Sequence, residues 1–326
     1  MASSRRPGTN EDVKTFGDTG FGRDYTSLVT WEDATTIDCV TGTTSPVLEC
    51  YRDATSYALP TSYWEINGAN TSSSYFRIIR AASGARHGGS PGTGIKFIGS
   101  TGDHVPFLMV EPYASIYDIE VLLETNTTGE FMAIKLFGAN TRAVACLVKI
   151  TDVGTGYDVS GIKLGETSCV AVNCIAYECE HHGFTGKGIV YNCISVGNGG
   201  AGFYPSTASM LGKNNIATGN SSYDYAATNW DTNSTHNLAS DATAPEYGTY
   251  YDSKTVAYVD AGNDDYRITN DADVVEQGTS LAADGTFAFD DDIAFTTRPS
   301  GSAWDLGAFE YVAAEGPTLA QFWSRW

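Results

Sequence analysis

A short internal repeat near the middle of the chain is the feature that most constrains its fold. The run Asn173-Cys-Ile is followed by Gly183-Phe, and both elements recur 19 residues later as Asn192-Cys-Ile and Gly202-Phe. Because two separate elements share one offset, chance composition does not explain the match. Repeats of roughly 20 to 50 residues, each too small to bury an apolar face alone, are typical of solenoids. The chain is therefore expected to wind into stacked coils.

Further strand-like segments extend this repeat along the chain. They are short, rich in β-branched and apolar residues, and recur at intervals of 28, 28, 19 and 22 residues. One short strand of the same kind in each period predicts parallel strands stacked about 4.8 Å apart. The segments cover residues 116–121, 144–150, 172–177, 191–196 and 213–218, and earlier candidates at 75–80 and 94–98 place the first coil near Tyr75.

Equivalent side chains of successive coils are expected to form ladders. Cys174 and Cys193 occupy the same place in the repeat and predict a column of thiols inside the core. Asn173, Asn192 and Asn214 predict a column of amides, which satisfy one another's donors and acceptors along the axis. These five residues are the predicted core ladder.

The charge balance excludes one class of partner. The chain has 19 Lys and Arg residues against 39 Asp and Glu residues, for a formal net charge of −20. A nucleic-acid-binding protein needs a basic stripe, and the sequence contains none. No apolar run follows the first residues, so we expect no membrane anchor, no classical secretion and synthesis in a cytosol.

The seven cysteines are interpreted first as free thiols that pack as small apolar groups. A disulfide scaffold would be shorter and denser in cysteine, and cytosolic synthesis disfavours it. One alternative stays open, because Cys39 and Cys50 flank a turn and could pair across a hairpin.

Five segments are expected along the chain. The first coil of a solenoid exposes backbone donors and an apolar interior, so a cap must precede it. A short amphipathic helix carrying Leu28 and Trp31 is predicted within that cap. The boundaries are 1–21 for an N-terminal arm, 22–74 for the cap, 75–254 for the coils and trailing loops, 255–312 for a closing region and 313–326 for an aromatic tail.

Both ends of the chain carry groups suited to docking on a partner. Arg5 and Arg6 make the arm basic on an otherwise acidic chain. Phe322, Trp323 and Trp326 make the tail aromatic, and such side chains are costly to leave in water. The tail therefore either folds back onto its own domain or docks on another chain, and these five residues are the predicted partner-docking residues.

The C-terminal part carries a resemblance to a known architecture. Asp290-Asp-Asp-Ile-Ala-Phe-Thr-Thr-Arg-Pro leads into Trp304-Asp-Leu-Gly-Ala-Phe-Glu-Tyr, and Tyr258-Val-Asp and Asp264-Asp-Tyr-Arg-Ile precede both. This order resembles the closing segment of many pectate-lyase-like, right-handed parallel β-helix proteins of phages and environmental bacteria. The resemblance implies an all-β solenoid of that kind, with an N-terminal cap and C-terminal closing strands.

A glycan-cleaving β-helix enzyme would need carboxylates on one outward face. Glycoside hydrolysis uses two carboxyl groups roughly 5–10 Å apart. Asp158, Glu178 and Glu180 are the residues that would act if the chain were such an enzyme, although they form no paired motif. The lysines of the central coils lack the acidic neighbours that a calcium-dependent lyase requires. No catalytic residue is therefore predicted, and the sequence leans away from catalysis.

A zinc site is considered and set aside. Cys174, Cys179, His181 and His182 follow the spacing Cys-x4-Cys-x-His-His, which is not a usual ligand spacing. Cys174 also belongs to the predicted ladder and should face the core. The sequence contains no phosphate loop and no dinucleotide fingerprint, so neither a metal nor a cofactor is expected.

The predicted function is that of a structural virion protein, most specifically a capsid decoration or a spike or fibre-like projection of a tailed bacteriophage. The expected partners are other capsid or tail proteins, further copies of this chain, with a trimer favoured by family analogy, and a host-surface glycan. One alternative is a polysaccharide-cleaving enzyme or tailspike, in which Tyr177, Tyr191 and Tyr204 would stack on sugar rings. A second alternative is a noncatalytic glycan-binding adhesin.

Overall fold

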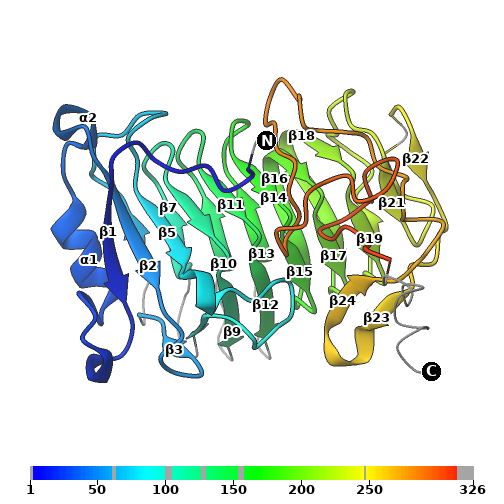
Figure 1. Ribbon diagram of the computed structural model, residues 1–326. Helices are drawn as coiled ribbons and strands as arrows, with labels where there is room; N and C mark the ends of the chain where they lie inside the picture. Colours follow the sequence, from blue (N-terminus) through cyan, green and yellow to red (C-terminus); the bar gives the residue numbers. More distant parts are fainter. Residues whose placement is uncertain are drawn as a thin grey trace, which may run out of the picture.

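The chain winds into a right-handed parallel β-helix (Figure 1). A computed structural model describes residues 3–60, 64–99, 105–125, 130–152, 158–245 and 247–313. Successive coils add one strand to each of three faces, and every strand pair within these faces is parallel. The predicted fold class is therefore confirmed by the strand pairing itself.

Two of the faces belong to one 13-stranded sheet, and the third is a nine-stranded sheet. The first two are continuous because β16 (His182–Tyr191) and β18 (Ala201–Lys213) are long enough to turn the corner between them.

The flank face contains β1 (Glu11–Phe16), β2 (Ser45–Cys50), β5 (Ile78–Ala81), β8 (Ser115–Tyr117), β11 (Arg142–Val144), β14 (Val170–Val172) and the second halves of β16 and β18. The open face contains β4 (Glu65–Ile66), β7 (Phe107–Met109), β10 (Glu130–Leu136), β13 (Asp158–Leu164), the first halves of β16 and β18, and β20 (Tyr223–Tyr225). The nine-stranded sheet contains β3 (Tyr57–Ala58), β6 (Lys96–Gly99), β9 (Glu120–Thr125), β12 (Leu147–Asp152), β15 (Ile175–Tyr177), β17 (Ile194–Val196), β19 (Ile216–Thr218), β21 (Asn237–Ala239) and β22 (Tyr250–Tyr251).

Short helices close the N-terminal end of the core (Figure 1). Helix α1 (Leu28–Thr35) begins where the Ser27 hydroxyl accepts a hydrogen bond from the Thr30 amide, as an N-cap residue does. It buries Leu28 and Trp31, the two residues expected to plug the coil. The remaining helical turns are α2 (Cys39–Gly42), η1 (Thr19–Phe21), η2 (Ser83–Ala85) and η3 (Ala261–Asn263).

The solenoid begins earlier than the sequence indicates. Strand β1 lies inside the segment expected to be a detached arm, and it pairs residue by residue with β2. Its run Glu-Asp-Val-Lys-Thr-Phe alternates too weakly to be recognised as a strand. The segment is a strand because it pairs with the buried strand β2, and not because of its own sequence preference.

One corner of the coil is built from residues with left-handed backbone conformation. Asparagine tolerates this conformation better than most residues, which explains the recurrence of Asn173, Asn192 and Asn214 at φ values of 52°, 49° and 58°. The Asn214 amide donates to Asn192 Oδ1 over 3.2 Å. The other amide donors bind backbone oxygens of the closing region, and Asn173 Oδ1 has no hydrogen-bond partner in the described part of the chain. The expected amide ladder therefore joins Asn192 to Asn214 but not to Asn173.

The neighbouring column points into the core. Cys146, Cys174 and Cys193 lie in it on successive coils, all fully buried. Asn215 and Asn237 continue the same column, and their side chains are 2.9 Å apart in a hydrogen bond. The sequence repeat alone did not indicate this second amide ladder, because asparagine there replaces cysteine. Cys39 and Cys50 are also buried free thiols.

The closing region lies along the side of the solenoid and does not cover its end (Figure 1). Strands β23 (Tyr258–Asp260) and β24 (Asp265–Ile268) form an antiparallel pair. The segment expected as a final strand, residues 305–311, is an irregular turn instead. Gly307 takes a left-handed φ of 77° there, and its carbonyl accepts from the Asn192 amide at 3.0 Å. Side-chain hydrogen bonds therefore replace sheet pairing.

Candidate functional site

The open face carries a column of polar and aromatic residues. Lys135, Lys163, Thr185 and Tyr204 lie in register on four successive strands. Glu130 lies 3.0 Å from the Lys135 ammonium and 3.6 Å from the Lys163 ammonium. The column therefore presents ammonium groups and a phenol ring along one line, whereas Thr185 between them is buried and its hydroxyl donates to Ser160 over 3.0 Å.

Tyr204 supplies a flat apolar surface at the end of this column. Its side chain is 42% exposed, and its ring is stacked on His182 at 4.7 Å with an angle of 11°. His182 Nδ1 accepts a hydrogen bond from the Ala201 amide, which places the ring proton of a neutral imidazole on Nε2. The stack is held from below by the backbone, so the outer face of Tyr204 is pre-positioned for a planar ligand.

The other two tyrosines considered for sugar stacking are not available for it. Tyr177 is 3% exposed and Tyr191 is fully buried. The closing region covers both, since the Tyr266 ring lies 5.6 Å from Tyr177 and Asp284 accepts from the Tyr191 hydroxyl at 3.4 Å. The expectation that these tyrosines face solvent is therefore wrong.

The three acids considered for catalysis lie on different parts of the coil. Glu178 follows β15 at a left-handed corner, and its carboxylate pairs with Lys149 of the nine-stranded sheet. Glu180 is exposed in the turn before β16. Asp158 begins β13, where its backbone pairs with Glu130 of the open face. Glu178 therefore forms an ion pair with a residue of the nine-stranded sheet, whereas Asp158 begins a strand of the open face.

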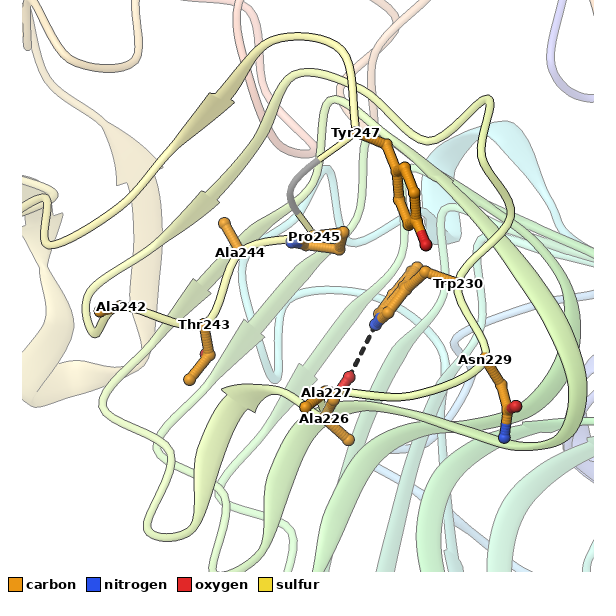
Figure 2. A pocket seen from close by; sticks show the side chains of 9 residues that line it. All are labelled: Ala226, Ala227, Asn229, Trp230, Ala242, Thr243, Ala244, Pro245 and Tyr247. Carbon is orange, nitrogen blue, oxygen red and sulfur yellow. Dashed lines mark hydrogen bonds between the residues drawn. The ribbon is translucent and has the colours of Figure 1, made fainter.

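A hollow of about 390 Å³ lies at the C-terminal end of the coil (Figure 2). Trp230 and Tyr247 form its aromatic wall, and Ala226, Ala244 and Pro245 are among the other lining residues. Trp230 is 8% exposed, and its indole nitrogen donates to the Ala226 carbonyl over 2.8 Å. Its ring also packs 5.5 Å from Tyr225, the last member of the core stack Phe184–Phe203–Tyr225. The hollow thus lies against an aromatic plug of the core.

Buried arginines fasten the separate segments to one another. Arg77 has a fully buried side chain and joins Glu111 to Glu32 of helix α1. Arg298 pairs with Glu310 inside the closing region, where both side chains are fully buried. Arg5 pairs with Asp118 of the coil and with Asp291 of the closing region. Arg77 and Arg5 therefore each link separate segments of the chain, whereas Arg298 holds the closing region together internally.

The expected docking arginines consequently face inward. Arg5 pairs with Asp118 and Asp291. The Arg6 guanidinium lies 4.1 Å from the Phe287 ring. Arg6 also donates to the Ala288 carbonyl over 3.2 Å. The closing region brings Phe287 and Asp291 to this place, which the sequence did not indicate. The other three predicted docking residues, Phe322, Trp323 and Trp326, lie outside the described residues.

The described residues were compared with two further kinds of site, a metal-ion site and a membrane-spanning helix. No group of three or more His, Cys, Asp or Glu side chains is arranged there to hold a metal ion. None of the helices in that part of the chain is long and apolar enough to cross a membrane.

Comparison with known proteins gives one structural likeness. No family model matches the sequence, and no curated protein matches it either. The chain is similar in fold to a solved structure described as the crystal structure of pectate lyase Pel9A, with a TM-score of 0.45 and 13% sequence identity. The match covers 95% of this chain and 98% of that chain. At this level the likeness adds nothing about activity.

Proposed function

We propose that the chain is a structural protein of a virus particle, a capsid decoration or a spike or fibre-like projection of a tailed bacteriophage. It would be synthesised in the host cytoplasm and incorporated into the virion. The resemblance of the closing motif to β-helix proteins of phages supports this origin, and the acidic composition suits a soluble exposed part.

The observation that carries the proposal is a set of buried ion pairs that hold parts of the chain together. Arg5 and Arg77 each join segments far apart in the chain, and Arg298 pairs with Glu310 within the closing region; none of the three side chains is more than 7% exposed. Breaking such a pair leaves an uncompensated buried charge, so these links oppose local opening. A particle component exposed outside the cell benefits from such resistance to unfolding.

The proposed partners are other capsid or tail proteins and further copies of this chain. A trimer is the proposed symmetry, by analogy with solenoid proteins of virions. The tail, residues 313–326, is the proposed docking peptide, because its aromatic residues follow the closing region directly. Sedimentation-velocity measurements would give the assembly mass: a trimer supports this part of the proposal, and a monomer at micromolar concentration contradicts it.

Counting copies of the chain in purified particles from its source tests the main proposal. Quantitative mass spectrometry with isotope-labelled peptides would give the number per particle. Hundreds of copies indicate a coat or decoration protein, and a handful indicates a tailspike. Absence of the chain from the particles would overturn the proposal.

A second candidate function is glycan binding on the open face. The specific observation in its favour is the exposed Tyr204 ring, stacked on His182 and aligned with Thr185 and Lys163. Aromatic faces flanked by polar groups suit sugar rings. A screen of host-surface polysaccharides that measures both binding and new reducing ends would separate an adhesin from an enzyme. Loss of cleavage in Glu178→Gln or Glu180→Gln would favour the enzyme alternative.

A further inference from the structure

We propose that a pocket between the N-terminal segment, the flank face and the closing region binds an oxyanion of the phosphate or sulfate type on Arg6 and Arg142. This proposal is independent of the virion function, because it depends on a different surface. Its ligand is identified by chemistry alone: a tetrahedral dianion, either free or as the terminal ester group of a larger molecule.

The pocket is assembled from three distant parts of the chain. Its volume is about 490 Å³, and its wall includes Arg6, Arg142, Thr286, Phe287 and Asn140. Arg142 lies in β11, in register with Ser115 of β8 and Val170 of β14. The closing region contributes Thr286 and Phe287, and the N-terminal segment that crosses the coils contributes Arg6 (Figure 1).

Arg142 is a buried cation without a counter-ion. The residue is 8% exposed. Among the described residues no carboxylate lies within 4 Å of its guanidinium, and its neighbouring hydrogen-bonding group is the Tyr117 hydroxyl. A buried charge is normally paired because its desolvation is expensive. The other buried arginines follow this rule, as Arg77 does with Glu111 at 2.5 Å.

Aromatic contacts compensate Arg142 only in part. Its guanidinium carbon lies 5.4 Å from the Phe76 ring centroid and 5.9 Å from that of Phe287. These distances approach the limit of about 6 Å for a cation–π contribution. Such contacts use none of the five N–H donors of a guanidinium, so donors beyond the one that faces the Tyr117 hydroxyl remain available to an acceptor in the pocket.

Arg6 adds a second positive charge to the same wall. No carboxylate is among the groups that act on it within the described residues, and burial together with the charge of Arg142 lowers the pKa of Arg6. The nearby Tyr117 hydroxyl donates to the Arg6 carbonyl over 2.9 Å and is therefore not a counter-ion. Two like charges in one partly dry site repel each other, and a bound dianion would relieve that repulsion.

The chemistry of the wall favours a phosphate or sulfate group over a carboxylate. Two guanidiniums match a charge of −2, and guanidinium forms strong charge-assisted hydrogen bonds to phosphate oxygens. Thr286 is exposed, and Asn140 and Ser168 also line the pocket. These hydroxyl and amide groups can complete the shell of a tetrahedral ion, which accepts more hydrogen bonds than a carboxylate does.

Thermal unfolding of the full chain in phosphate, sulfate and acetate tests the proposal. Chloride would hold the ionic strength constant, because general screening also changes stability. A ligand that binds only the folded state raises the melting temperature with the logarithm of its concentration. We expect phosphate and sulfate to do so at millimolar concentrations and acetate to act at least ten-fold more weakly. No shift beyond that of chloride would overturn the proposal.

Three variants locate the binding. Arg142→Gln should weaken phosphate binding at least ten-fold, whereas Arg267→Gln, which removes an exposed arginine paired with Asp265, should leave it unchanged. Thr286→Glu places a carboxylate at an exposed position of the pocket lining and should abolish the phosphate shift without disturbing the core. A phosphate shift retained in both Arg142→Gln and Thr286→Glu would overturn the assignment. Glucose 6-phosphate that binds more tightly than inorganic phosphate would indicate an ester ligand, and equal binding would indicate the free ion.

Discussion

Arg5 and Asp118 form a buried ion pair that joins the N-terminal segment to the body of the solenoid. Arg5 Nη2 lies 2.7 Å from Asp118 Oδ1, and the two side chains are 7% and 3% exposed. The same guanidinium donates to the Ile293 carbonyl over 2.9 Å and lies 3.2 Å from Asp291. The first residues of the chain, the coil and the closing region therefore share one charged centre.

Removing the cation from this centre should be strongly destabilising. Arg5→Met leaves Asp291 without this partner and Asp118 with only the more distant Arg86, at 3.8 Å, and we expect the free energy of unfolding to fall by about 3–5 kcal/mol. Urea unfolding followed by tryptophan fluorescence measures the loss. The double variant Arg5→Met with Asp118→Asn should lose less, because it removes the stranded charge. A loss below about 1 kcal/mol in the single variant, as for an exposed pair, would contradict the prediction.

His87 should make stability depend on pH in the acid range. Burial and the charge of Arg5 lower the pKa of His87 to about 3, from an ordinary value near 6.5. The folded state then binds fewer protons than the unfolded state between these values. The contribution of His87 to the free energy of unfolding is fully present above about pH 6.5 and decreases as the pH falls toward 3. At pH 4.5 the expected loss is about 3 kcal/mol, at about 1.4 kcal/mol for each pH unit.

The variant His87→Asn isolates this contribution. Its amide oxygen can accept the Gly89 N–H bond that His87 Nδ1 accepts at 2.9 Å. Free energies of unfolding at several values between pH 7 and pH 4 should decrease less steeply in the variant than in the wild type. Parallel curves would show that His87 does not titrate with folding.

Asn214 should hold the closing region against the coil. Its side chain exchanges two hydrogen bonds with the backbone of Thr279, at 2.8 and 2.9 Å, and its φ is 58°. Asn214→Gly removes the amide but keeps the left-handed backbone accessible, and we expect a loss of about 1–3 kcal/mol. Asn214→Ala should cost roughly 1 kcal/mol more, because alanine is strained in this conformation.

Limited proteolysis distinguishes this local role from a general loss of stability. Cleavage between residues 270 and 311 should appear earlier in both Asn214 variants, whereas the coil should stay intact. Uniform cleavage along the chain would show that the substitution destabilises the whole fold instead.

Tyr204 should serve glycan binding and contribute little to stability. Its ring is 42% exposed and stacks on His182. We expect Tyr204→Ala to reduce affinity for a bound polysaccharide at least ten-fold, because aromatic stacking on the ligand is lost. The melting temperature should change little. The matched variant Tyr223→Ala removes another exposed tyrosine and should bind normally; equal losses in both would argue against a site centred on Tyr204.

The aromatic tail should be dispensable for folding. The closing region is fastened upstream of it by the buried pair Arg298–Glu310. A chain ending at Val312 should therefore keep the melting temperature of the full chain within a few degrees. It should also fail to join its particle in a complementation assay. Normal incorporation of the shortened chain would refute the docking role of the tail.

Part of the fold could be predicted because the chain repeats itself. The buried positions of Cys174 and Cys193 follow from the offset between the two Asn-Cys-Ile runs, and helix α1 follows from Leu28 and Trp31. The start of the coil at Glu11 did not follow, because β1 is ordered by its pairing with β2. The exposure of Tyr177 and Tyr191 was predicted wrongly, because a later segment covers them.

By itself the sequence determined the parallel coil and the places of the Cys174–Cys193 and Asn192–Asn214 ladders, but not that of Asn215 and Asn237. Ladder contacts join residues separated by one repeat, as Asn192 and Asn214 are by 22 positions, so the spacing is visible in the chain. Only the tertiary structure decided how the N-terminal segment and the closing region bind to the coils, and where Arg6 and Arg142 line a pocket. Those contacts join residues without any periodic relation, as Arg5 and Ile293 are over 288 positions. Their burial and charge depend on where the closing region packs, which no local pattern specifies.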